Sequence, residues 1–279
     1  MMKKILRILI LLTFSALMIP ACDIVDEPYL VPVDGGNGPG PGDKVRKVLL
    51  EDYTGQKCPN CPEAAEIAHS LEAKYGEKLI LLTVHAGYYA IPDGDFTADF
   101  RTAEGTELNA FFEVFANPLG MVNRTEYGGN RVLQTGDWES AVDIQIEMEV
   151  EAAITLTNTY TAGTRQLDCL LETEFMETLE GTYNICAFIT ESGIISPQQT
   201  EQDVDTNYVH NHVLRGSMNG TWGDVAGEDG LAIAGTKLTN SYSYTLPQGW
   251  NADNCTLVAF VYNTATNEVV QAEEKKITP

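Results

Sequence analysis

Residues 48–62, VLLEDYTGQKCPNCP, run from an apolar strand directly into a Cys-x-x-Cys pair at the start of a predicted helix. A helix N-terminus presents unpaired amide N–H groups and the positive end of the helix dipole, which favour a thiolate on the first cysteine. Cys58 is therefore the expected nucleophile. Cys61 follows one helical turn later on the same face, where it can close a disulfide with Cys58 or resolve a mixed disulfide.

The segment after Cys58 is predicted to be a helix over residues 59–75. Prolines are tolerated in its first turn because the N–H groups there have no acceptor within the helix. Gly76 is the expected C-cap. Apolar residues recur along the segment at three- and four-residue spacing, namely at Ala64, Ile67, Ala68, Leu71 and Tyr75.

Residues 45–148 alternate between predicted strands and helices, which is the pattern of a sheet with helical crossovers. The run over residues 79–84 is continuously apolar, as is typical of a strand buried on both faces. The predicted strands are 48–53, 79–84, 119–123 and an edge strand at 132–133, and the further helices are 106–114 and 138–148, the last capped by Asp137.

The rest of the chain contains short segments rich in β-branched and aromatic residues, without helical periodicity. Such a series predicts two packed antiparallel sheets. We therefore expect an α/β domain over residues 45–148, followed by an all-β domain, an antiparallel Ig-like β-sandwich, over residues 149–279. The predicted strands are 150–160, 166–173, 183–191, 210–218, 241–246, 255–263 and 268–277.

Composition limits the class of partner. The chain has 279 residues, of which 44% are hydrophobic, enough for two ordinary cores. Its 40 acidic and 17 basic residues give a formal charge of −23. Phosphate binding needs clustered Lys and Arg, so this charge argues against nucleic acid as a partner.

Residues 1–21 have the pattern of a signal peptide, with basic residues ahead of an apolar run that is too short to span a bilayer. The small residue before Cys22 resembles a bacterial lipobox, in which the cysteine becomes the lipidated N-terminus. Cleavage nearby, with Cys22 as an ordinary thiol, is the alternative. Residues 22–44 are rich in Gly and Pro and read as a tether. We therefore expect a membrane-anchored lipoprotein of the cell envelope that faces either the periplasm or the cell surface.

The segment LLEDYTGQKCPNC resembles the active-site segment of thioredoxins. The resemblance implies that Asp52 is buried beneath the dithiol and accepts a proton from the resolving cysteine. It also implies that Pro118 is a cis-proline opposite the dithiol. The backbone of Asn117 would then bind a substrate peptide. Lys57 replaces the aromatic residue that normally precedes the first cysteine, and it is the other residue expected to contact substrate.

Several motifs resemble the 28-kilodalton outer-membrane-protein-related lipoprotein family of Bacteroidota. The resemblance covers nearly the whole chain and implies a thioredoxin-like domain followed by a β-sandwich, located at the outer membrane. It implies an architecture and a location rather than a reaction. The motifs are TGQKCPNCPE, LLTVHAG, NPLGMVNR, YVHNHVLRG, GTWGD and WNADNCTLVAFVYN.

The cysteine pair admits three interpretations: a redox-active disulfide, a purely structural disulfide or half of a zinc site. Zinc would need two further ligands, and no second Cys or His pair follows at zinc-finger spacing. An exported Cys-x-x-Cys in a βαβ pattern favours redox chemistry. We therefore expect a Cys58–Cys61 disulfide, with no metal and no other cofactor.

Histidines and the remaining cysteines give weaker signals. His85 should lie on the dithiol side of the sheet, where it can tune the thiol but more often caps or fills a core. His210 and His212 alternate, so both would point to one face of a strand. They form either a weak metal pair or, the favoured interpretation, a structural group with Tyr208 and Arg215.

Three further cysteines, Cys169, Cys186 and Cys255, allow at most one internal disulfide. Cys169 and Cys186 lie on successive predicted strands and are candidates for pairing. Buried free thiols are the alternative.

These features predict thiol–disulfide exchange on exported proteins or peptides, in a direction that the sequence leaves open. Cys58 would attack a substrate disulfide and Cys61 would resolve the mixed disulfide, helped by Asp52. The alternative is a tethered outer-membrane binding or adhesion protein. In that case the thioredoxin-like domain is structural, and acidic loops at residues 201–207 and 220–230 engage a partner.

Overall fold

Strand β1 (Val48–Thr54) is the apolar strand that precedes the dithiol, and all of its residues are buried. It pairs in parallel with β2 (Leu79–His85) and antiparallel with β3 (Leu119–Val122). The structure, a computed structural model, describes residues 44–278. The predicted signal peptide, the lipidation site Cys22 and the tether up to residue 43 lie outside the described residues.

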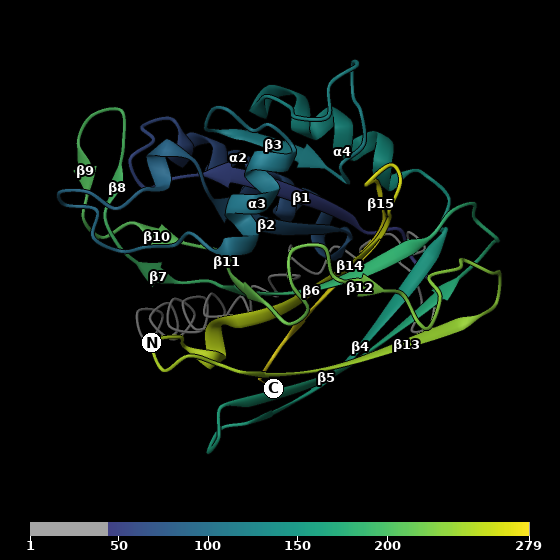
Figure 1. Ribbon diagram of the computed structural model, residues 1–279. Coiled ribbons are helices and arrows are strands. Elements are labelled where there is room, and N and C mark those ends of the chain that lie inside the picture. Colours follow the sequence, from purple (N-terminus) through teal and green to yellow (C-terminus); the bar gives the residue numbers. More distant parts are fainter. Residues whose placement is uncertain (1–43, 279) are drawn as a thin grey trace, which may run out of the picture. The chain divides into compact units, whose positions relative to one another are not determined.

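Both faces of β1 and β2 are covered, which explains why their sequences are continuously apolar. Helices α2 (Cys61–Tyr75) and α4 (Trp138–Ile146) pack on one face (Figure 1). Helix α3 (Ala103–Phe111) packs on the other face through Leu108. The three predicted helices are therefore confirmed, each with bounds shifted by two or three residues at one or both ends.

The ends of the helices follow local chemistry in part. Helix α2 is followed by Gly76 with φ of 57°, a conformation that favours glycine, as predicted. Thr102 caps α3 by accepting a hydrogen bond from the Gly105 amide at 2.9 Å. The prediction of Asp137 as a side-chain cap is wrong. Its backbone is already helical, because a 3₁₀ turn (Thr135–Asp137) leads into α4.

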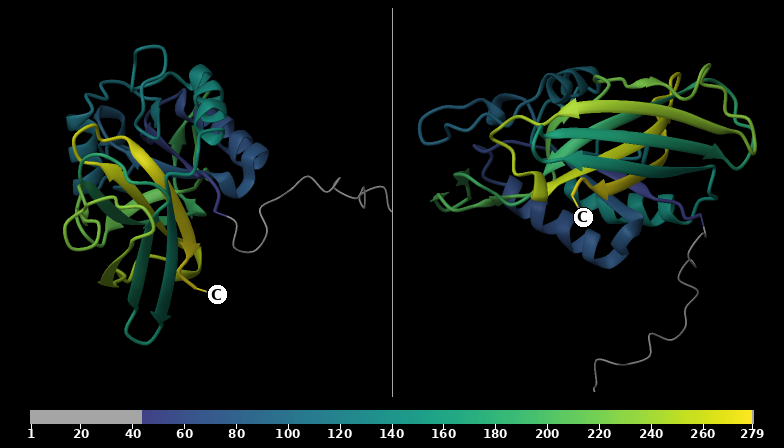
Figure 2. Two further views of the ribbon diagram at one scale, coloured as in Figure 1. Left: turned by 90° about the vertical axis from the view of Figure 1, so that its right-hand side faces the viewer. Right: turned by 90° about the horizontal axis from the view of Figure 1, so that it is seen from below.

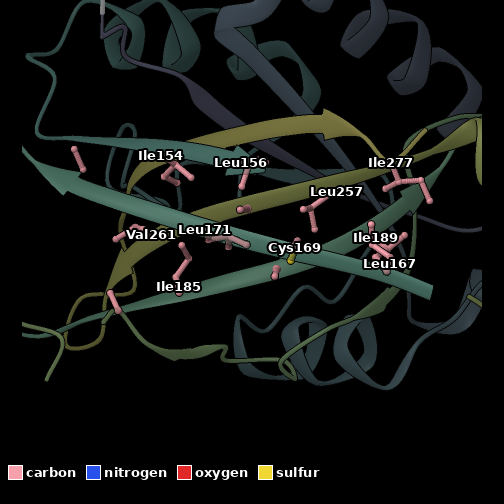
Figure 3. Close-up of a cluster of buried hydrophobic side chains, with 14 of the residues drawn as sticks. Ile154, Leu156, Leu167, Cys169, Leu171, Ile185, Ile189, Leu257, Val261 and Ile277 are labelled. Carbon is pink, nitrogen blue, oxygen red and sulfur yellow. The ribbon is translucent and has the colours of Figure 1, made fainter. Parts of the chain in front are cut away.

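A second, smaller sheet forms an outer layer of the molecule (Figure 2). Its strands β4 (Ala152–Thr161), β5 (Gln166–Phe175) and β13 (Lys237–Thr245) are antiparallel, in the order β13-β5-β4. Aliphatic side chains fill the space between this sheet and strands β6 (Tyr183–Glu191) and β14 (Cys255–Asn263) (Figure 3). Burial alternates along β5 but is nearly continuous along β6 and β14, because these two strands are covered on both faces.

The main sheet has eight strands and takes them from both halves of the chain. Its order is β15-β14-β6-β11-β2-β1-β3, where β15 is Val269–Lys276, and β12 (Asp224–Val225) also pairs with β6. Strand β11 (Val213–Ser217) is the junction, since it runs antiparallel to β6 and parallel to β2. The fold is thus mixed α/β, with a main mixed sheet and small antiparallel sheets. The boundary predicted at residue 148 falls between α4 and β4, and strands from both sides of it share the main sheet.

The single strand predicted over residues 210–218 is wrong. Two strands occur there, β10 (Val209–His210) and β11. His212 separates them because its φ of 53° lies in the left-handed region, which a continuous strand does not use. His210 and His212 therefore do not share one strand face. The other short elements are β7 (Ile194–Ile195), β8 (Gln198–Gln199), β9 (Val204–Asp205) and the 3₁₀ turns Gly76–Lys78, Tyr88–Ala90 and Ala252–Asn254.

The edge strand predicted at residues 132–133 is reduced to an isolated bridge between Leu133 and Gly120. Gly120 also lies against Trp138, and a Cβ there would come within 2.7 Å of the indole ring. The chain therefore passes β3 closely at this point but pairs with it over one residue only.

A buried ion pair joins β1 to the end of β3 inside the apolar core. Arg124 Nε and Nη2 donate to the two carboxylate oxygens of Glu51 at 2.8 Å each, and both side chains are wholly buried. The rings of Phe112, Phe260 and Tyr262 lie 5.0, 4.9 and 5.6 Å from the guanidinium carbon. The pair therefore lies where the helical half of the molecule packs against β14.

The three remaining described cysteines are free thiols, so the candidate Cys169–Cys186 disulfide is not formed. All three are buried. Burial raises the pKa of Cys169 to about 11 and the pKa values of Cys186 and Cys255 to about 12. These thiols are unreactive core residues at neutral pH.

Candidate functional site

Cys58 and Cys61 form a disulfide in the turn between β1 and α2, with their Cα atoms 5.4 Å apart. Helix α2 begins at Cys61, two residues later than predicted, and Cys58 lies just ahead of its first turn. The Cys58 amide donates to the Gly55 carbonyl at 3.0 Å, which fixes the turn. The pair thus lies at the positive end of α2, where a thiolate on Cys58 is favoured once the disulfide is reduced.

A small cavity lies beside the disulfide, lined by Asp52, Cys61 and His85 among others. Its volume of about 30 Å³ is enough for about two water molecules. Asp52 Oδ1 and both ring nitrogens of His85 are buried without a hydrogen-bond partner among the described residues, and water in this cavity would satisfy them. Burial raises the pKa of Asp52 to about 7, against the opposing effect of nearby His69.

All four histidines of the chain line this cavity. His85 lies on the dithiol side, as predicted, and burial holds its pKa well below the usual value. The ring of His210 lies 5.5 Å from that of His85 and 4.8 Å from that of Tyr208, in agreement with the favoured structural interpretation. Arg215 instead pairs with Glu191 at 3.5 Å.

Pro118 follows a cis peptide bond from Asn117, as the resemblance to thioredoxins implies. It immediately precedes β3, whose register pairs Leu119 with Tyr53 near the end of β1. Pro118 therefore lies at the end of the sheet where β1 leads into the dithiol turn. Asn117 lies beside Gly87, where a Cβ would be 3.5 Å from the Asn117 side-chain oxygen.

Lys57 lies against the loop that contains Tyr88 and Tyr89. Its amide donates to the Tyr89 carbonyl at 3.1 Å, and its ammonium is 4.9 Å from the centre of the Tyr88 ring. Gly55 permits this approach, since a Cβ there would be 2.4 Å from the Tyr89 carbonyl carbon. Tyr88 is 72% exposed, and Phe115, in the loop of the cis-proline, is 91% exposed. Exposed aromatic rings therefore occur in the loop against which Lys57 lies and in the loop that contains the cis-proline.

Residues 196–199, here called the cover segment, shield the dithiol turn. Gln198 Nε2 donates to the Cys58 carbonyl at 3.0 Å, and the Gln199 amide donates to the Gln56 carbonyl at 2.7 Å. Cys58 in this turn is only 1% exposed. This contact could not be predicted from the sequence, because it joins residues 140 positions apart and has no local pattern.

His69, Glu72 and His212 form a second group of side chains next to the cavity, also missed from sequence. Glu72 lies 3.4 Å from a ring nitrogen of each histidine. The three-residue spacing of His69 and Glu72 on a predicted helix already indicates that these two side chains are neighbours. The approach of His212 depends on the turn between β10 and β11.

Residues 106–279 match the family model described as outer membrane protein Omp28. The matched region begins after the disulfide, so it does not include Cys58 or Cys61. No curated protein matches the chain in sequence. Among residues 44–278, no helix is long and apolar enough to cross a membrane.

The solved structures that match the chain include the following three. HBP35 of Porphyromonas gingivalis aligns with a TM-score of 0.64 and 16% identity, over 85% of this chain and 76% of that one. Protein AGR_C_4864 from Agrobacterium tumefaciens aligns with a TM-score of 0.51 and 11% identity, over 84% of this chain and 96% of that one. A domain of the outer membrane lipoprotein Omp28 from P. gingivalis aligns with a TM-score of 0.32 and 22% identity, over 47% of this chain and 92% of that one. The first two share the fold with this chain.

Proposed function

The chain belongs to the Omp28 outer membrane protein family, and we propose that this outer-membrane lipoprotein exchanges disulfides with exported proteins or peptides. The observation that carries the proposal is a Cys58–Cys61 disulfide at the start of α2, beside a cavity that also holds the buried carboxyl of Asp52. An outer-membrane location keeps the pair away from the cytosol, in a setting where disulfides persist.

The arrangement of elements supports a thioredoxin-like domain over residues 45–148. In sequence order its main elements are β1, the dithiol, α2, β2, α3, the cis-proline, β3 and α4. Within residues 44–278 no strand precedes β1, and β11 from the second half pairs with the edge of β2. The packing of β4, β5 and β13 against β6 and β14 supports a β-sandwich of the Ig type in the second half.

In the reductive direction, the Cys58 thiolate attacks one sulfur of a substrate disulfide and expels the other as a thiolate, which leaves a mixed disulfide. Cys61 then gives its proton to the Asp52 carboxylate and attacks the Cys58 sulfur, which releases the second substrate thiolate. Two electrons pass from the protein dithiol to the substrate. Asp52 suits this role because its pKa of about 7 lets it take up and release a proton near neutral pH. The reverse sequence oxidises a substrate dithiol.

Lys57 and the backbone of Asn117 are the residues we assign to substrate contact. Lys57 lies against the loop of Tyr88, and Asn117 belongs to the loop of Phe115; both aromatic rings are exposed and offer apolar surface to a bound peptide. Attack at Cys58 requires the cover segment to move, since the residue is 1% exposed.

Trapping the mixed disulfide tests the proposal. In full-length Cys61→Ser protein, Cys58 can join a partner but cannot release it. Incubation with an envelope extract should give disulfide-linked adducts that are visible on non-reducing gels and are cleaved by dithiothreitol. Mass spectrometry identifies the trapped partners. A chain with both cysteines replaced by Ser is the matched control. If the Cys61→Ser chain captures no more than this control, the proposal is wrong. The reduction potential of the wild-type pair then decides the direction of the reaction.

A tethered binding protein with a structural disulfide is the second candidate. The near-complete burial of Cys58 under the cover segment favours it, because a structural disulfide has no need of access. Insulin reduction in the presence of dithiothreitol separates the two. No rate above background, together with alkylation of reduced Cys58 only at a pH higher than an ordinary thiol requires, would favour binding.

A further inference from the structure

We infer that His69, Glu72 and His212 form a binding site for a divalent transition-metal ion, with Zn²⁺ the best match to the ligands. One atom of each side chain, a ring nitrogen or a carboxylate oxygen, lies within 4.8 Å of the other two. His69 Nδ1 is 3.4 Å from Glu72 Oε2, and His212 Nε2 is 3.4 Å from Glu72 Oε1. Two imidazoles and one carboxylate are an established three-ligand set for zinc, with the fourth position open to water.

The ligands come from rigid parts of the fold. His69 and Glu72 are three residues apart on α2, so they lie on the same helix face. His212 is held by the main sheet, because its carbonyl accepts the Thr83 amide of β2 at 2.9 Å. Its own amide donates to Ser192 Oγ at 3.0 Å. The left-handed conformation of His212 thus places its ring toward α2 rather than along β11.

The spacing suits a small ion. Zinc bonds of about 2.0–2.1 Å in tetrahedral geometry place neighbouring ligand atoms about 3.3–3.4 Å apart. Each nitrogen is at this distance from one oxygen of Glu72, His69 from Oε2 and His212 from Oε1, so a single ligating oxygen requires a small rotation of the carboxylate. The imidazole rings, with centroids 5.6 Å apart, must approach each other slightly. The side chains of His69 and Glu72 are 41% and 35% exposed, which leaves them room to adjust.

The charges around the cluster favour a cation. Glu274 of β15 places a further carboxyl group near His212 and Glu72. Asp52 lies on the other side of His69 across the cavity. Lys47, which acts on Glu274, is already paired with Glu273. Within residues 44–278, the ring nitrogens of His69 and His212 are the basic groups that lie within 4.0 Å of the Glu72 carboxylate.

Titration calorimetry of the purified full-length chain with ZnCl₂ tests the site, and Co²⁺ serves as a spectroscopic probe. The protein is kept in the disulfide form, so that Cys58 and Cys61 cannot act as ligands. We expect one ion per chain and visible Co²⁺ bands of a four-coordinate nitrogen and oxygen site. Mg²⁺ should not compete, because it prefers six oxygen ligands.

Variants on the surface of α2 identify the ligands. Glu72→Gln and His69→Gln should each weaken Zn²⁺ binding by more than about tenfold. Glu66→Gln, which removes an exposed acid from the same helix, should leave the affinity unchanged. Circular dichroism checks that each variant folds. Absence of binding to the wild-type chain, or equal affinity in the wild type and in the Glu72 and His69 variants, would overturn the inference.

The site goes beyond the proposed function and uses neither thiol. A chain with both Cys58 and Cys61 replaced by Ser should therefore still bind the ion with the wild-type affinity. Loss of binding in that chain would assign the metal to the thiols and overturn the inference. Failure to trap a mixed disulfide would leave the metal measurement unaffected, so the two proposals fail separately.

Discussion

At the scale of single residues, Asp52 couples the site to pH. Its folded pKa of about 7 lies above the value of about 3.9 for an unfolded chain. The folded protein therefore holds a proton between about pH 4 and pH 7 that the unfolded protein has lost. The free energy of unfolding falls as the pH rises through this window.

Asp52→Asn should remove this decrease in the free energy of unfolding with rising pH. At about pH 8 the variant should be more stable than the wild type by up to about 4 kcal/mol. Urea denaturation at about pH 5 and pH 8 measures the effect. Asp95→Asn, at an exposed position, is the control and should leave the pH dependence unchanged. The same loss of stability with pH in the Asp52→Asn variant and the wild type would contradict the assignment.

The buried pair of Glu51 and Arg124 gives a second prediction at this scale. Arg124→Met leaves the Glu51 carboxylate buried without its partner and should cost about 3–5 kcal/mol of unfolding free energy. Adding Glu51→Leu removes the unpaired charge and should recover a large part of that loss. Urea denaturation of both single variants and the double variant measures the coupling. A double variant as unstable as the sum of the singles would show that the two side chains do not interact.

At the scale of elements, the cover segment controls access to Cys58. Gln198 donates to the Cys58 carbonyl at 3.0 Å and to the Gly55 carbonyl at 3.3 Å. Hydrogen bonds of this kind contribute about 0.5–1.5 kcal/mol each to the closed arrangement. We therefore expect movement of the cover segment to limit attack on a thiol that is 1% exposed.

Gln198→Ala should speed the alkylation of Cys58 in the reduced protein by about fivefold to thirtyfold, the equivalent of about 1–2 kcal/mol. Iodoacetamide labelling followed by mass spectrometry measures the rate at that residue. Gln202→Ala, an exposed glutamine of the same hairpin, is the matched control. Equal labelling rates for the two variants would mean that the cover segment does not shield the thiol.

At the scale of the whole molecule, the main sheet makes the two halves of the chain depend on each other. The β2 edge is paired by β11, and the core beside α3 is completed by Phe188, Phe260 and Tyr262 from the second half. A fragment of residues 44–148 would expose this apolar surface and leave an unpaired sheet edge.

We therefore expect the fragment of residues 44–148 to be aggregated or loosely folded, although it contains every residue of the dithiol site. Near-ultraviolet circular dichroism and dye binding to exposed apolar surface measure this, with residues 44–279 as the comparison. A fragment that unfolds cooperatively and binds no dye would show that the first half is an independent domain.

The elements of the first half were predictable because each depends on a local pattern. The 3.6-residue period of Ala64, Ala68 and Leu71 identifies α2, and the apolar run of β2 identifies a strand covered on both faces. The positions of Asp52 and Pro118 followed from the resemblance to thioredoxins. The separation of β10 from β11 could not be predicted from the sequence, because long-range hydrogen bonds impose the conformation of His212.

The sequence by itself determined that a Cys-x-x-Cys pair follows a buried strand at a helix start, in a chain that begins with the pattern of an exported lipoprotein. Only the tertiary structure decided what surrounds that pair. The contact of Gln198 with Cys58, the Glu51–Arg124 ion pair and the contact of His212 with Glu72 join residues 73 to 140 positions apart. Contacts across such distances depend on strand order in the sheet, and local patterns carry no information about that order.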